Sequence, residues 1–214
     1  MSPLLILAGL FLAAVPVFHP NNTCHDWLQK WGQLASHPLW LPIHQLSMAA
    51  YALGAVAALA VPFLGERTAL GFLGGGSLGA GLGIQTMLAL IHATSVSALG
   101  EAFNAAPSED ARLAIRLSAE AWVRYDVGAS LVAAALLSGG AALVCWYFFR
   151  RGALSRWSAL FFAALGLVWG LQAHGAFRRL HLPTTEWIPF ASLSLWFAGL
   201  GLLFLARRGS AVTG

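Results

Sequence analysis

Six apolar segments alternate along the chain with polar or charged connections. They cover residues 3–18, 42–64, 70–99, 122–149, 156–177 and 187–206. Because about 20 apolar residues in a helix cross the hydrocarbon core of a bilayer, this pattern predicts six transmembrane helices, of which the first is short. We find no internal repeat and no soluble domain between these segments. The expected architecture is therefore an all-α membrane bundle that forms a single domain over residues 1–214.

The polar and aromatic stretch between the first two spans predicts a further, shorter helix. Thr23 and Asp26 have the spacing of a capping box, and the residues after them place Trp27, Leu28, Trp31 and Leu34 at helical intervals. We expect an amphipathic helix over residues 23–35 that lies on the outer membrane surface. The first span has no basic residues ahead of it and no small-residue cleavage site, so we expect a retained helix rather than a signal peptide.

The connection between the third and fourth spans, residues 100–124, contains half of the eight acidic residues. Ser108 is followed by Glu109 and Asp110, which is the pattern of a helix N-cap with acidic residues in the first turn. Arg116, Glu120 and Arg124 follow at four-residue steps. This connection is therefore predicted to be a helix that leads directly into the fourth span.

Composition identifies the class of protein. The chain is 58% hydrophobic and only 9% charged, whereas about 25% of the residues of a soluble domain are charged. These values indicate an integral membrane protein. The net charge of +4 does not indicate nucleic-acid binding, because the arginines lie at the ends of the spans and form no stripe.

The basic residues also bear on orientation. Six spans divide the lysines and arginines equally between the two sides, with Arg67, Arg150, Arg151, Arg156, Arg207 and Arg208 on the side of both termini. Because these six lie in short connections or at the C-terminus, the positive-inside rule favours cytoplasmic termini. The expected location is the bacterial inner membrane.

The third span carries glycines at a strict four-residue spacing, namely Gly71, Gly75, Gly79 and Gly83. Small residues at this spacing let another helix backbone approach closely in lipid. The glycines therefore predict a packing surface, either for another span of this chain, for self-association or for a partner protein. His92 lies about 180° around the same helix and faces away from them.

All seven histidines fall on the predicted outer side, and three of them lie inside spans. These three are His44, His92 and His174, and Asp126 enters the fourth span at a similar depth. An ionisable group in lipid costs at least ~2.5 kcal/mol on insertion scales, so these side chains should face the bundle interior and find partners there.

A set of imidazoles on separate helices is suited to a redox cofactor. His92 paired with His174 or with His44 would supply the two axial ligands of a b-type haem, and Arg124 and Arg178 stand where the propionates need cations. Alternatively, His44, His92, His174 and Asp126 would bind a transition-metal ion. We therefore expect an outer histidine site for haem or a metal that serves membrane electron transfer.

Three other interpretations remain open. The histidines would be ordinary interfacial polar groups in a non-catalytic accessory subunit of a membrane complex, or the chain would bind or transport a small amphiphile between the second, third and fifth spans. The outer loop also holds a possible surface metal set, His19, Cys24, His25, Asp26 and His37. The sequence contains no Gly-x-Ser-x-Gly, Walker or His-Glu-x-x-His motif.

Overall fold

A computed structural model describes residues 2–19, 26–64, 67–173 and 187–212, and within these ranges all regular structure is helical. The elements are α1 (Ser2–Phe18), α2 (Trp27–Ala35), α3 (Trp40–Leu59), the 3-10 turn η1 (Val61–Phe63), α4 (Ala69–Ile91), the π-helical segment η2 (His92–Val96), α5 (Ser97–Ala105), α6 (Glu109–Arg150), α7 (Arg156–Ala173) and α9 (Trp187–Val212). The prediction of an all-α fold is confirmed for this part of the chain.

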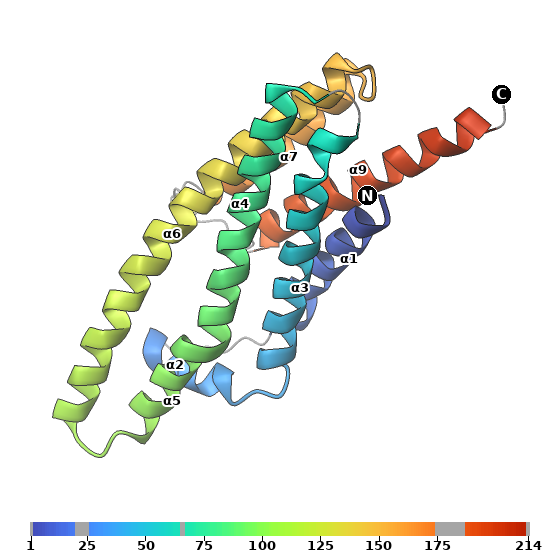
Figure 1. Ribbon diagram of the computed structural model, residues 1–214. Helices are drawn as coiled ribbons and strands as arrows, with labels where there is room; N and C mark the ends of the chain where they lie inside the picture. The colour runs from blue at the N-terminus through green and yellow to red at the C-terminus, as the bar shows by residue number, and fades with distance from the viewer. Residues whose placement is uncertain (1, 20–25, 65–66, 174–186, 213–214) are drawn as a thin grey trace.

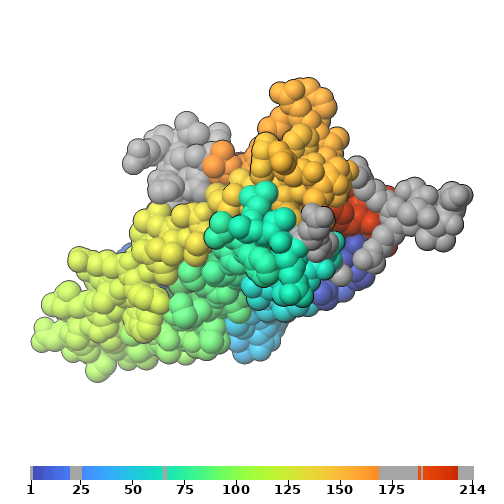
Figure 2. All heavy atoms as spheres, turned by 45° about the horizontal axis from the view of Figure 1, so that its top comes forward, coloured from blue at the N-terminus to red at the C-terminus, as the bar shows by residue number. Residues whose placement is uncertain are grey.

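The long helices form a bundle with α4 between α3 and α6 (Figure 1). α1 packs against α3 on one side and α9 on the other, and α7 joins α6 to α9. One apolar core runs through these helices and contains fully buried side chains from the beginning, the middle and the end of the chain, such as Leu12, Leu82 and Phe197. The start of α4 and the turn from α6 to α7 lie next to each other at one end of the bundle (Figure 2).

Three helical segments are long and apolar enough to cross a membrane by length and composition. They are Trp40–Phe63, Ala69–Ala105 and Glu109–Arg150. The other three predicted spans also form apolar helices in the described residues, but these helices are shorter. α6 has 42 residues and is therefore about 63 Å long, twice the thickness of a hydrocarbon core of about 30 Å. The first turns of α6 consequently extend beyond the apolar part of the bundle.

The predicted glycine surface packs against other helices of the same chain. A Cβ atom at Gly75 would lie 2.5 Å from the carbonyl oxygen of Ala58, and one at Gly79 would lie 3.1 Å from the Leu59 side chain, so these two glycines bring α4 against α3. Gly71 faces the ring of Tyr147 instead. Gly83 has open space around it in the described structure, and a contact with a second protein there stays a prediction.

A second glycine contact, absent from the four-residue pattern, joins α4 to α6. A Cβ atom at Gly140 would lie 2.5 Å from the backbone nitrogen of Leu78, and one at Gly81 would lie 3.0 Å from the carbonyl oxygen of Ala133. Close approach on two faces explains why the glycine-rich half of α4 lies between two neighbours.

The outer segments agree only in part with their prediction. The predicted cap at Ser108 is confirmed, since its hydroxyl accepts a hydrogen bond from Ala111 N and α6 continues from there into the fourth span, but residues 100–105 belong to the separate helix α5. The amphipathic helix begins at Trp27 with Asp26 as its N-cap, while Thr23 lies outside the described residues.

Substitution of Gly75 tests the close approach of α3 and α4. We expect Gly75→Ala to destabilise the protein by roughly 1–3 kcal/mol, because the new methyl group meets backbone rather than a flexible side chain. Gly76→Ala is the matched control, since a Cβ atom there meets nothing within 4 Å and alanine is the better helix former by about 1 kcal/mol. Thermal unfolding in detergent measures both, and equal effects would contradict the packing described.

Candidate functional site

His44 is held in one orientation by the first turn of α3. Its side chain is buried, with 7% of its surface exposed, and its Nδ1 atom lies 2.8 Å from the carbonyl oxygen of Trp40. A carbonyl oxygen only accepts hydrogen bonds, so Nδ1 carries the proton in this contact. The lone pair of a neutral His44 is therefore on Nε2, the atom available to a ligand.

His92 begins the π-helical segment η2, a single wide turn in which backbone hydrogen bonds join residues five apart rather than four. The wider turn loosens the usual backbone pairing, and the hydroxyl of Ser97 donates a hydrogen bond of 2.9 Å to the His92 carbonyl oxygen. The same hydroxyl accepts a bond of 2.6 Å from Nε1 of Trp40. Ser97 thus fastens the end of α4 to the start of α3, and the ring centres of His44 and His92 are 6.4 Å apart.

Asp126 of α6 faces the same histidine. Its Oδ1 atom lies 3.4 Å from Nε2 of His92, and both side chains are about one third exposed. The Oδ1 atom itself is enclosed and has no hydrogen-bond partner among the described residues. An enclosed carboxylate oxygen therefore points at an imidazole nitrogen without being satisfied by it.

Aromatic rings and a third histidine surround this group. The ring of Trp40 is 4.2 Å from that of His44, and His19 at the end of α1 lies 5.8 Å from His44. Trp31 of α2 lies 6.3 Å from His92. We call His19, His44, His92 and Asp126 the histidine site; it lies where α1 ends, α3 begins and α4 gives way to η2.

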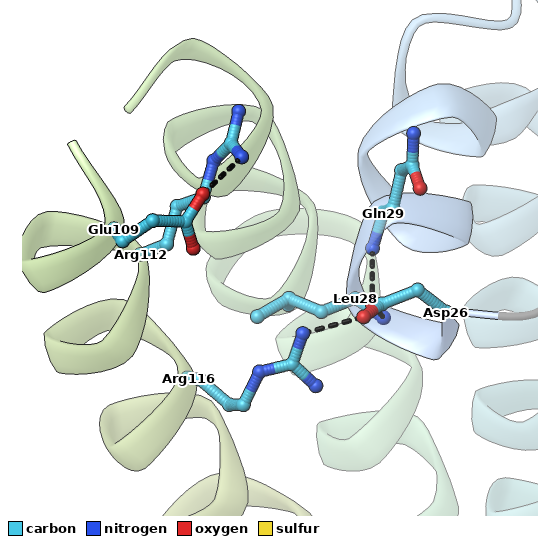
Figure 3. Close-up of polar contacts among 6 residues, drawn as sticks. All are labelled: Asp26, Leu28, Gln29, Glu109, Arg112 and Arg116. Atoms are coloured by element: carbon cyan, nitrogen blue, oxygen red, sulfur yellow. Dashed lines mark hydrogen bonds and ion pairs between the residues drawn. The ribbon is translucent and has the colours of Figure 1, made fainter. Parts of the chain in front are cut away.

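The helix α2 lies beside this site through Trp31 and is fixed to α5 and α6. Figure 3 shows the side chain of Arg116 reaching from α6 to the carboxylate of Asp26, which also accepts hydrogen bonds from the first turn of α2. Leu28 is buried in a small cluster with Phe103 and Ala119. A Cβ atom at Gly32 would lie 2.3 Å from the carbonyl oxygen of Gly100. The expected surface helix is therefore packed against protein along one side.

The sequence predicted part of this site. The structure brings together His44, His92 and Asp126, whereas Arg124 is exposed on α6, and His174 and Arg178 lie outside the described residues. Sequence reasoning assigned His19 to the outer loop and Trp31 to the membrane surface. The signal for His19 was available, because antiparallel spans place the end of the first helix beside the start of the second.

The arrangement does not form a complete metal centre by itself. Among residues 2–19, 26–64, 67–173 and 187–212, no three His, Cys, Asp or Glu side chains are grouped as a ready metal site. Two residues of the predicted surface metal set already have other partners. Asp26 pairs with Arg116 and caps α2, and Nδ1 of His37 accepts a hydrogen bond from Leu39 N. Cys24 and His25 lie outside the described residues.

Removal of the Ser97 hydroxyl tests the junction between α3 and η2. We expect Ser97→Ala to cost roughly 1–3 kcal/mol in unfolding free energy, because Trp40 Nε1 and the His92 carbonyl oxygen both lose their partner. Ser47→Ala is the control, since this equally buried hydroxyl bonds only to Ile43 of its own helix. Chemical unfolding in detergent is the measurement, and a neutral Ser97→Ala would show that the junction contributes no stability.

The ion pair that holds α2 should respond to acid. The hydrogen bond from Arg116 lowers the pKa of Asp26 below its ordinary value of 3.8, so the pair adds stability above that pH and loses it as the pH falls through the lowered pKa. Asp26→Asn keeps a good N-cap but removes the charge. We therefore expect wild type to unfold at a higher temperature than Asp26→Asn at about pH 6, and this difference to shrink as the pH falls below 3.8 and through the lowered pKa. A difference that is constant with pH would contradict this role.

Comparison of the chain with protein-family models, curated protein sequences and solved structures finds no match. The function is therefore argued from the geometry of the histidine site.

Proposed function

We propose that the chain is a membrane protein whose histidine site binds a transition-metal ion and serves membrane redox chemistry. The observation that carries this proposal is the pair formed by Nε2 of His92 and the unsatisfied Oδ1 of Asp126, 3.4 Å apart. His44 is the third proposed ligand. Imidazole and carboxylate together suit zinc, copper and iron.

The distance between the two atoms matches shared ligation better than a hydrogen bond. Nitrogen and oxygen ligands lie about 2.0–2.1 Å from a zinc-sized ion, and two corners of a tetrahedron with such bonds are about 3.4 Å apart. An ion in this position would satisfy the enclosed oxygen of Asp126. It would also offset the cost of placing a carboxylate and an imidazole within an apolar bundle.

The orientation of His44 supports its part in the proposal. Metal-binding histidines usually donate their second ring N–H to a carbonyl or carboxylate, which fixes the ring and the free nitrogen. His44 makes this contact with Trp40. Since its ring centre is 6.4 Å from that of His92, a modest side-chain rotation would bring its Nε2 to an ion held by His92 and Asp126.

A b-type haem is the second candidate, and the separation of the two rings favours it. Two imidazoles that bind one iron from opposite sides have ring centres about 6 Å apart. In that case Nε2 of His92 would turn from Asp126 toward His44. Arg124, two residues before Asp126 on α6, would be the described cation available to a haem propionate. This candidate needs only two ligands, His44 and His92.

The membrane arrangement belongs to the same proposal. We infer six spans in the bacterial inner membrane, with both termini in the cytoplasm and the histidine site at the outer end. The support is that every predicted apolar segment is mainly helical where described, and that the start of α4 and the basic turn from α6 to α7 share one end of the bundle, since the ring of Tyr147 lies beside both Gly71 and Arg151.

Metal analysis and an absorption spectrum of the detergent-purified protein test both candidates. We expect about one first-row transition-metal ion per chain, and at least tenfold weaker binding of added Zn²⁺ after chelation in His92→Ala and Asp126→Asn. His37→Ala is the control, because this exposed histidine lies at the same end but outside the site. A Soret band that disappears in His44→Ala and His92→Ala would favour haem instead. A colourless protein that binds no ion would overturn the proposal.

A further inference from the structure

The end of the bundle that carries the start of α4 and the turn from α6 to α7 has an exposed basic surface. Its arginines are all exposed and lie just before α4, at the end of α6 and at the start of α7: Arg67, Arg150, Arg151 and Arg156. The only acidic residue in the sequence of the two connections 65–69 and 150–156 is Glu66, which lies outside the described residues. The described part of this end therefore presents positive charge and no carboxylate.

Three of these arginines lie over aromatic rings. The distances from guanidinium carbon to ring centre are 5.3 Å for Arg67 and Phe63, 5.3 Å for Arg151 and Tyr147, and 5.9 Å for Arg156 and Trp157. Stacking uses the face of a guanidinium, whereas its N–H groups lie in the plane and can still bind an anion. Within the described part of the chain, neither Arg67 nor Arg156 forms an ion pair.

The opposite end of the bundle treats its stacked arginines differently. Arg112 and Arg116 also lie over a ring, that of Phe103, at 6.0 Å and 5.0 Å from its centre. Each of them has a carboxylate partner, Glu109 for Arg112 and Asp26 for Arg116. The chain therefore supplies anions to the stacked arginines at this end. At the basic surface, the complementary anion for Arg67 and Arg156 has to come from another molecule.

The neighbours of these arginines favour an anion that is attached to hydrocarbon. The side chains of Phe63 and Trp157 are 62% and 76% exposed, and Phe63 meets the exposed ring of Phe72 edge to face at 6.1 Å. Phe63 is also the last residue of a helical segment long and apolar enough to cross a membrane. Cations beside exposed rings at the end of a span fit a phospholipid, in which a phosphate and acyl chains belong to one molecule.

We propose that the basic surface binds anionic phospholipids. The guanidinium N–H groups of Arg67 and Arg156 donate hydrogen bonds to lipid phosphates, and the acyl chains lie against the exposed rings of Phe63 and Trp157. A zwitterionic lipid binds more weakly, because its own cationic group offsets the phosphate charge. This inference is independent of the proposed metal or haem, since the histidine site lies at the other end of α4.

Lipid binding by the full-length protein in detergent tests the proposal. The probes are phosphatidylglycerol and phosphatidylcholine with the same acyl chains. An arginine close to an anionic lipid surface strengthens binding about fivefold, so we expect wild type to prefer phosphatidylglycerol at least fivefold. Arg67→Gln and Arg156→Gln should each weaken phosphatidylglycerol binding, and the double variant should prefer it by less than about twofold. Equal binding of the two lipids to wild type would overturn the proposal.

Arg112→Gln is the matched control, because it removes one stacked arginine that already has a carboxylate partner. We expect it to leave the lipid preference unchanged, and an effect as large as that of Arg67→Gln would contradict a site at the basic surface. The double variant Arg67→Lys/Arg156→Lys keeps both charges and should retain most of the preference. A large excess of inorganic phosphate should not displace the lipid; complete displacement would indicate a site for free phosphate and overturn the proposal.

Discussion

The hydroxyl of Ser97 accepts a hydrogen bond from the indole of Trp40 and donates one to the backbone of His92. These two bonds join the beginning of one long helix to the irregular end of another, and they do so in an apolar setting where an unpaired polar group is expensive. The spacing of His44 and His92 follows from this junction, because each histidine is on a turn that the junction holds. The candidate chemistry therefore depends on a side chain that takes no part in it.

The glycine contacts and the histidine site divide the bundle into two regions. At the end of α4 that begins with Ala69, Gly75 and Gly140 bring three backbones together and leave space for little else. At the other end, the π-helical segment and the large rings of Trp31 and Trp40 hold the helices around polar groups. Close packing at one end supplies the stability that a less regular, polar site at the other end does not.

Hydrophobic patterning predicted the apolar helices, the cap at Ser108, and the association of His44, His92 and Asp126, because each of these follows from spacing along one helix or depth in one bundle. It did not predict η2, since a single added residue leaves no trace in an apolar sequence. It also placed α2 on lipid rather than on α5. The apolar face of an amphipathic helix fits either surface, and long-range contacts such as that of Gly32 with Gly100 distinguish them.

The backbones of Gly32 and Gly100 are in direct contact, and neither position has room for a side chain. α2 and α5 are therefore held to each other at this contact. Since α5 continues directly from η2, a displacement of α2 that carries α5 with it would strain the turn that begins with His92. The position of α2 and the backbone geometry at His92 are, for this reason, coupled.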